Sequence, residues 1–199
     1  MNVYKHINLR IFYKKILFPF SNMEIPEFLR GQSRLVPGDS LIVVPVWNLW
    51  SFLFPSNRIG TLAKVTRTLD SRGIAMVEIR GINRVNIKRR QSLLFADCSD
   101  TEENIHENSD MIEKLRKKAQ EFVFLIDINE SDRLIYLMNF ISSLNEMTDF
   151  LSNYFISDFR DKLRLLNETD VNSRSNLLLA QLDKQLVKVN KLKNRISLQ

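Results

Sequence analysis

Residues 59–87, IGTLAKVTRTLDSRGIAMVEIRGINRVNI, have the pattern of two β-strands joined by a turn. Apolar and polar residues alternate over 60–66 and again over 75–80, which predicts two strands with one buried and one exposed face each. Residues 70–73 favour a turn, since Asp and Gly are common in tight turns. Gly81 interrupts the second strand pattern, and it predicts a bulge or a corner, as at the edge of a small barrel.

The total composition is that of an ordinary soluble globular protein. The chain has 199 residues, of which 44% are hydrophobic and 26% charged, so it is long enough to bury a real core. The net charge of +6 is unevenly distributed: residues 1–100 carry 15 Lys/Arg and 7 Asp/Glu, and residues 101–199 carry 14 and 16. Because charge and hydrophobic period change at the same place, we expect two domains, residues 1–105 and 106–199.

The rest of the N-terminal half contains further strand patterns. The continuous apolar run 41–46, LIVVPV, predicts a strand buried on both faces. The run 16–20, ILFPF, predicts a short strand with its proline at a sheet edge. Residues 1–15 form either a frayed arm or an irregular first strand, and the acidic stretch 97–110 is expected to be a flexible connector.

From Asp110 onward the hydrophobic period is helical. Ser131 and Asp132 can cap a second helix, and two short apolar segments follow it. Asp170 can cap a long last helix that runs to residue 196, with Arg174 as its partner one turn on. The helices are predicted from these apolar stripes: Ile112, Leu115, Ala119, Phe122 and Val123; Leu134, Ile135, Leu137, Met138 and Ile141; Leu177, Leu178, Leu182, Leu186, Val189 and Leu192. We therefore predict an α+β protein with an N-terminal small β-barrel-like module, a pseudo-barrel, followed by a C-terminal α-helical bundle with a long last helix.

Several stretches resemble the LON substrate-binding domain, which is the N-terminal domain of Lon proteases. The resemblance covers residues 16–190, and it rests on Leu17–Phe18–Pro19–Phe20, the run 41–46, Gly60, Thr61, Gly81, Arg84, Val85, Ile87, Glu168, Asp170 and Arg174. It implies a PUA-like pseudo-barrel that binds polypeptide substrates in protein quality control. The expected function is recognition of unfolded or damaged protein, or action as an adaptor or regulator of proteolysis, with a Lon-type ATPase/protease as a further partner.

The sequence does not predict an enzyme. It contains no G-x-x-x-x-G-K-[ST] phosphate loop, and nothing resembles the domain that carries the Ser–Lys pair of Lon proteases. Its two histidines and single cysteine are scattered without the spacing of metal ligands. Cys98 is therefore expected to be an inert residue near a strand end. We predict no catalytic residue, no metal site and no cofactor.

The candidate substrate-binding residues are the aromatic ones of the stretch 47–55, WNLWSFLFP, where LON domains usually have a polar connection. These residues are Trp47, Trp50, Phe52 and Phe54. Three interpretations remain open. The stretch folds back as core, it forms an exposed apolar patch that binds unfolded polypeptide, or it forms an oligomer contact. An exposed apolar patch generally indicates a partner.

Two alternatives concern other partners. The basic N-terminal half and Lys88–Arg89–Arg90 would suit a nucleic-acid-binding module, although a solvated strand end explains this run better and nucleic acid is not the expected partner. The leucine stripe of the last helix would suit a homo-oligomer, although packing against the preceding helices is favoured. No run approaches the roughly 18–20 apolar residues of a membrane-spanning helix, and no signal peptide is recognisable, so we expect a cytoplasmic protein without a membrane partner.

Overall fold

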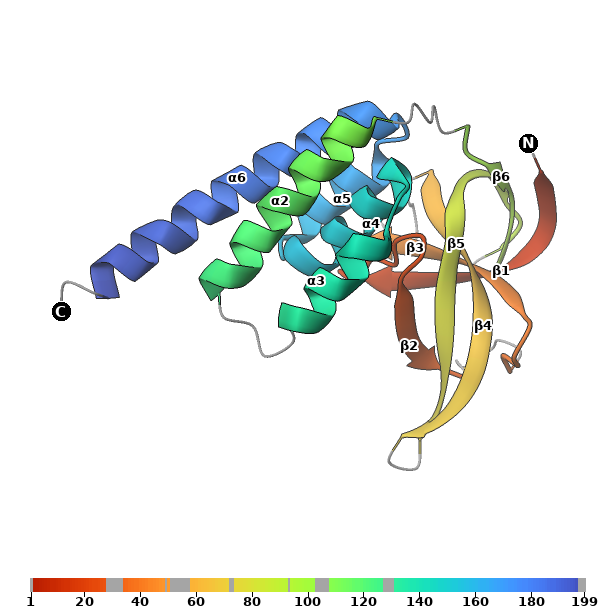
Figure 1. The fold of residues 1–199 in the computed structure, drawn as a ribbon. Coiled ribbons are helices and arrows are strands. Elements are labelled where there is room, and N and C mark those ends of the chain that lie inside the picture. Colours follow the sequence, from red (N-terminus) through yellow and green to blue (C-terminus); the bar gives the residue numbers. More distant parts are fainter. Residues whose placement is uncertain are drawn as a thin grey trace. The chain divides into compact units, whose positions relative to one another are not determined.

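A computed structural model describes residues 2–27, 34–48, 50, 58–71, 74–92, 94–102, 108–126 and 131–196. The chain divides into two compact units, Met1–Glu102 and Glu103–Gln199. The first unit holds the strands and the second holds the helices that Figure 1 labels. Whether residues 1–105 and 106–199 act as separate domains stays a prediction.

The described residues of the first unit contain six strands, which form one mixed sheet. They are β1 (Val3–Tyr13), β2 (Asn22–Pro26), β3 (Ser40–Val46), β4 (Ile59–Ser71), β5 (Ile74–Arg90) and β6 (Phe95–Asp100). Their order is β2-β5-β4-β3-β1-β6, with a further pairing of β6 to β5 that closes a ring. β1 and β3 are parallel and the other neighbours are antiparallel. The predicted barrel-like module is confirmed, although the ring is not evenly closed.

The long strand β5 makes this closure possible. One of its edges pairs with β4 along most of its length. The other edge is shared, because residues 76–80 pair with β2 and residues 85–90 pair with β6. The ladder to β4 shifts register just after Gly81, so that Ile82 has no partner there. The predicted bulge at Gly81 is therefore confirmed. A bulge bends its strand, which helps the sheet to close into a ring.

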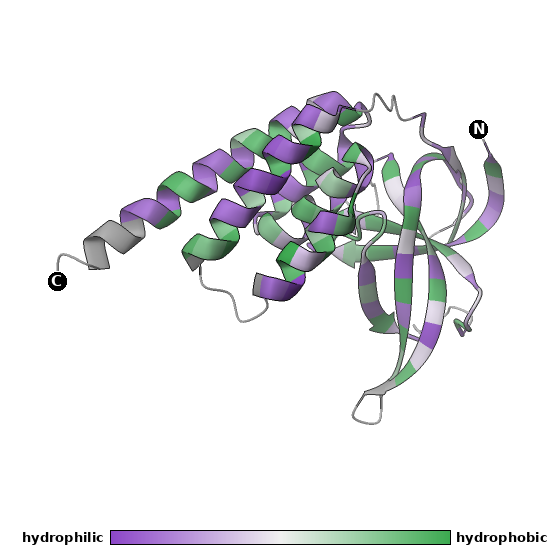
Figure 2. Cartoon of the chain, viewed as in Figure 1, coloured by the Kyte–Doolittle hydropathy of each residue, from purple (hydrophilic) through white to green (hydrophobic). Residues whose placement is uncertain are grey.

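The core of the first unit lies on both sides of β3. Leu41 and Val43 belong to one apolar cluster, and Ile42 and Val44 belong to another. The prediction that this strand is buried on both faces is confirmed. Figure 2 shows the contrasting pattern of β4 and β5, along which hydrophobic and hydrophilic residues alternate.

Two local predictions are wrong. Residues 16–20 do not form a strand, since the chain there lacks ladder bonds and turns at Pro19 and Phe20. The strand that precedes them is β1, so the first-strand interpretation of residues 1–15 is the correct one. Residues 97–100 are not a connector but lie in β6. Their alternation of polar residues with the buried Cys98 reflects a strand with one face in the core.

The second unit is a bundle of α2 (Ser109–Ile126), α3 (Ser131–Phe140), α4 (Leu144–Phe155), α5 (Phe159–Asn167) and α6 (Val171–Ile196). The long last helix packs against α2, α4 and α5, as predicted from its leucine stripe. Leu178 and Leu182 of that stripe are fully buried. No helix among the described residues is both long enough and apolar enough to span a membrane.

Candidate functional site

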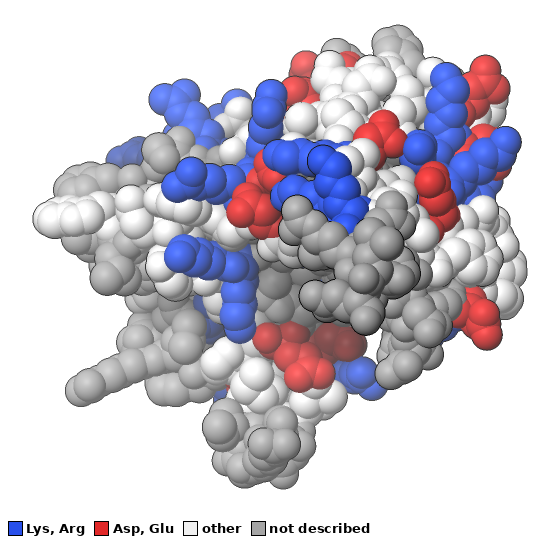
Figure 3. All heavy atoms as spheres, turned by 90° about the vertical axis from the view of Figure 1, so that its left-hand side faces the viewer, with Lys and Arg blue, Asp and Glu red and all other residues white. Residues whose placement is uncertain are grey.

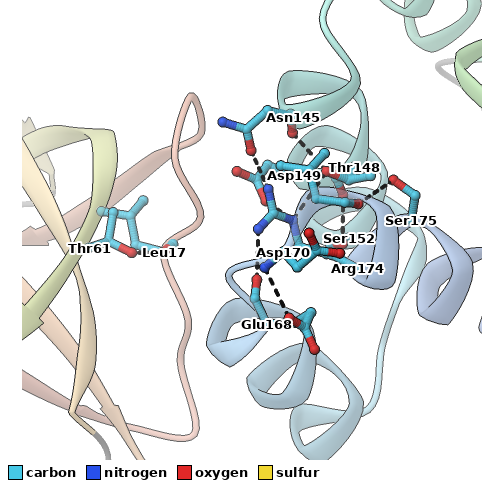
Figure 4. A network of polar contacts seen from close by, with 11 residues as sticks. Leu17, Thr61, Asn145, Thr148, Asp149, Ser152, Glu168, Asp170, Arg174 and Ser175 are labelled. Atoms are coloured by element: carbon cyan, nitrogen blue, oxygen red, sulfur yellow. Dashed lines mark hydrogen bonds and ion pairs between the residues drawn. The ribbon is translucent and has the colours of Figure 1, made fainter. Parts of the chain in front are cut away.

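A buried contact fixes the loop between β1 and β2. Thr61 on β4 donates its hydroxyl hydrogen to the carbonyl oxygen of Leu17 at 2.6 Å (Figure 4). Gly81 on β5 binds the same loop through two backbone hydrogen bonds, both of 2.9 Å. Its N–H donates to the carbonyl of Ser21, and its carbonyl accepts from the N–H of Phe20. A Cβ at Gly81 would lie 2.3 Å from the carbonyl oxygen of Phe18. Only glycine therefore permits this approach.

The two tryptophans predicted as binding residues lie at and beyond the end of β3. Trp47 has 36% of its side chain exposed and Trp50 has 74%. Neither side chain is buried core, so the core interpretation does not hold for these two. Phe52 and Phe54, the other two predicted residues, lie outside the described residues.

Parallel pairing of β1 with β3 brings other side chains to Trp47. The last pair of this ladder joins Tyr13 to Val46, so the residues that follow each strand meet at one end of the sheet. The Lys14 ammonium lies 5.1 Å from the ring centroid of Tyr13 and 5.5 Å from that of Trp47. Tyr13 is itself exposed. We call Tyr13, Lys14 and Trp47, together with the exposed Trp50 three residues further along the chain, the strand-end aromatic surface. It offers flat apolar rings with polar edges, which suit contact with partly apolar ligands.

A second polar framework lies in the helical unit around Arg174, which is fully buried. Its guanidinium donates to the carbonyl of Glu168 at 2.7 Å and to the Thr148 hydroxyl at 3.3 Å (Figure 4). It also donates to the side-chain oxygen of Asn145 and lies 3.8 Å from the buried carboxylate of Asp149. These contacts join the start of α6 to α4. Their role is structural, since the partners named here all belong to the helical unit itself.

The predicted cap of the last helix is present. The Asp170 carboxylate accepts the N–H of Ser173 at 2.8 Å, and the Glu168 carboxylate accepts the N–H of Asp170 at 3.0 Å. Both bonds satisfy backbone groups that a helix start leaves open. The sequence pattern located Glu168, Asp170 and Arg174 but not the α4 partners.

The nucleophilic and metal-binding chemistry of the described residues is sparse. Cys98 is completely buried in the core of the first unit. Burial raises the pKa of its thiol to about 11, helped by the nearby carboxylates of Asp100 and Asp97. The thiol is therefore protonated at neutral pH and a poor nucleophile. Within the described ranges, no group of three or more His, Cys, Asp or Glu side chains could hold a metal ion.

The basic run at the end of β5 lies beside acidic residues of β6. Arg89 is paired in the ladder with Asp97. The pKa of Asp97 is lowered, first by the hydrogen bond from the N–H of His6, then by Gln91, and to a smaller extent by Arg89. Figure 3 presents a different face, the left-hand side of Figure 1, and there too acidic side chains lie among the basic ones. Mixed charge of this kind does not favour a phosphate-binding surface.

The fold is that of Lon N-terminal domains. One solved structure, the N-terminal domain of Mycobacterium avium complex Lon protease, superimposes with a TM-score of 0.63 at 16% identity, over 90% of this chain and 98% of that one. The Lon N-terminal domain protein from Xanthomonas campestris gives a TM-score of 0.61 at 16% identity, over 89% and 98% of the two chains. No curated protein sequence matches the chain.

The sequence itself defines the family. Residues 32–184 match the sequence model of the ATP-dependent protease La (LON) substrate-binding domain. The chain therefore belongs to the LON substrate-binding domain family. The matching model describes a substrate-binding domain, which is the non-catalytic part of such proteases, so the resemblance inferred from the sequence is confirmed.

Proposed function

We propose that this chain binds polypeptide substrates, recognises unfolded or damaged protein, and acts as a non-catalytic adaptor or regulator of proteolysis in the cytoplasm. The observation that carries the proposal is membership of the LON substrate-binding family together with the exposed tryptophans of the strand-end aromatic surface. A Lon-type ATPase/protease would supply ATP hydrolysis and peptide-bond cleavage. A homo-oligomer is compatible with this role.

The proposed mechanism is capture of apolar segments. Burying a tryptophan ring against an apolar side chain removes a large area from water, which is why tryptophan is common among residues that dominate binding energy. Strand addition can contribute as well, because β2 is a terminal strand in the order of the described sheet. Main-chain hydrogen bonds at such an edge do not depend on the sequence of the added chain.

The test is a titration of the purified chain with a fluorescently labelled, permanently unfolded polypeptide, followed by anisotropy at low and high salt. Wild-type protein is expected to give a saturable response that salt leaves unchanged. The double variant Trp47→Ala/Trp50→Ala should bind at least about tenfold more weakly, a difference of about 1.4 kcal/mol. Phe124→Ala is the matched control, because Phe124 lies on α2 and is 73% exposed.

The outcomes separate the interpretations. Equal affinity of the tryptophan double variant and wild type would remove these residues from the site. A response of wild-type protein that disappears at high salt would indicate electrostatic binding of the polypeptide instead of apolar capture. Absence of binding by folded wild-type protein would refute the proposed function.

A further inference from the structure

A groove of about 250 Å³, open to solvent, lies on the outer face of β4 and β5. It is lined by Phe20, Lys64, Thr66, Arg80, Gly81 and Ile82. We call it the Phe20 groove. It does not involve the tryptophans of the strand-end aromatic surface.

Phe20 forms one apolar wall at a cost in backbone energy. Its φ of 63° lies in the left-handed region, which bulky side chains rarely occupy. The two main-chain bonds to Gly81 hold it there. The side chain remains 41% exposed, so the strained backbone does not serve to bury it. Such strain with an exposed aromatic side chain is a feature of binding sites.

Ile82 is a second apolar residue of the lining, and it is the bulged residue of β5. Leu62 pairs with Asn83 and Ala63 pairs with Gly81, so Ile82 is the additional residue between them. Its side chain is 44% exposed. A bulge that redirects a side chain in this way is often found beside functional sites.

Two cations also line the groove. Lys64 and Arg80 are direct partners in the β4–β5 ladder and both are exposed. Like charges in this position destabilise a sheet. Among the described residues neither has an ion pair. Of the nearby carboxylates, Glu78 is bound to Arg67.

Two further carboxylates on neighbouring segments, those of Asp39 and Glu24, form no ion pair with Lys64 or Arg80 among the described residues. Asp39, next to the partner of Lys64 on β3, accepts the N–H of Val36 at 2.9 Å. Glu24 on β2 lies opposite Glu78 in the ladder and is exposed. The groove therefore combines two apolar side chains with two cationic side chains that lack an internal counterion in the described structure.

We propose that the Phe20 groove binds a polypeptide segment in which an apolar side chain is adjacent to aspartate or glutamate. The apolar side chain contacts Phe20 and Ile82, and the carboxylate contacts Lys64 and Arg80. Because the groove is open to solvent, a polypeptide chain can enter it at one end and leave at the other. The acidic residue can therefore lie within the chain and need not be a C-terminal carboxylate. This inference rests on the proposed function and names the class of segment that it selects.

The test compares two fluorescein-labelled peptides, Gly-Gly-Ser-Glu-Phe-Glu-Ser-Gly-Gly and the same peptide with Gln for both Glu, by anisotropy at low salt. The acidic peptide is expected to bind about tenfold more tightly to wild-type protein, as charge-assisted hydrogen bonds require. Lys64→Glu should abolish this preference. It should also raise the melting temperature, since it converts a like-charge pair into an opposite-charge pair.

Two further variants keep the test independent of folding. Phe20→Asn removes the apolar wall while retaining a residue type that tolerates the left-handed region, and both peptides should bind it more weakly. Glu24→Gln removes a neighbouring negative charge and should tighten binding of the acidic peptide. Equal binding of the two peptides by wild-type protein, or unchanged preference in Lys64→Glu, would overturn the inference.

The result also distinguishes this inference from the broader proposal. In one outcome, wild-type protein binds unfolded polypeptide, the variant Trp47→Ala/Trp50→Ala does not, and the groove variants bind it as wild type does. The proposed function then stands, and the Phe20 groove is not the site of this binding. If the acidic peptide binds as expected while unfolded polypeptide does not bind at all, the groove inference stands and capture of unfolded protein fails.

Discussion

Replacement of Arg174 by methionine should strongly destabilise the helical unit. Methionine fills a similar volume but removes the donors that reach Glu168, Thr148 and Asn145. It also leaves the fully buried carboxylate of Asp149 without the cation 3.8 Å away. Removing one partner of a buried ion pair costs about 3–5 kcal/mol, chiefly because the remaining charge stays buried. The acceptors that lose a hydrogen bond are included in this range rather than added to it.

The assay is urea denaturation followed by far-UV circular dichroism at 222 nm, which reports mainly on the helices. A loss of about 4 kcal/mol would be a large part of the roughly 5–15 kcal/mol that stabilises a typical domain. Arg164→Met is the control, since Arg164 is exposed on α5, and it should change stability by less than about 0.5 kcal/mol.

A double variant tests the cause. Arg174→Met/Asp149→Leu removes both charges, so it should be less destabilised than the sum of the two single variants. A loss below about 1 kcal/mol for Arg174→Met, or additive losses in the double variant, would refute the argument that a buried charge pair stabilises the junction of α4 and α6.

Three further predictions concern the β unit and are measured by urea denaturation. Gly81→Ala should lower the free energy of unfolding by about 2–4 kcal/mol, since the new Cβ overlaps the Phe18 carbonyl and disturbs two backbone hydrogen bonds. Gly38→Ala is the control, because its Cβ meets no atom and only the positive-φ strain, about 1 kcal/mol, is added. Thr61→Val should cost about 1–3 kcal/mol by leaving a buried carbonyl without its donor; no loss would contradict this. Because the pKa of Cys98 is raised, its stabilising contribution is complete below about pH 9 and lost toward about pH 11. Cys98→Ala should remove this loss of stability at high pH. The same pH dependence of stability in the variant and in wild-type protein would contradict the prediction.

The sequence predicted the local parts of the fold well. Alternation over 60–66 and 75–80 indicated β4 and β5, because a period of two follows directly from strand geometry. Asp170 was predicted as a cap because a cap depends on residues three positions apart. Residues 16–20 were mispredicted, since an apolar extended run looks the same whether its backbone pairs in a ladder or bonds to Gly81.

The candidate site was less predictable because it depends on contacts distant in sequence. An apolar stretch such as 47–55 has the same composition in a core and on a surface, so the exposure of Trp47 and Trp50 required the structure. The position of Lys14 near Trp47 follows from parallel pairing of β1 and β3, which no local pattern reveals. The α4 partners of Arg174 were missed for the same reason, since they lie 26 and 29 residues away.

The contacts that complete the β unit also shape the Phe20 groove. Gly81 admits the loop that follows β1, and its bonds hold Phe20 in the strained conformation that exposes the ring. The bulge that follows Gly81 adds Ile82 to the lining of the same groove. A substitution at Gly81 would therefore alter folding and the groove together, and lost binding in that variant would not identify the site. Lys64 is more informative, because stability and affinity for an acidic segment are expected to change in opposite directions there, whereas damage to the fold would lower both.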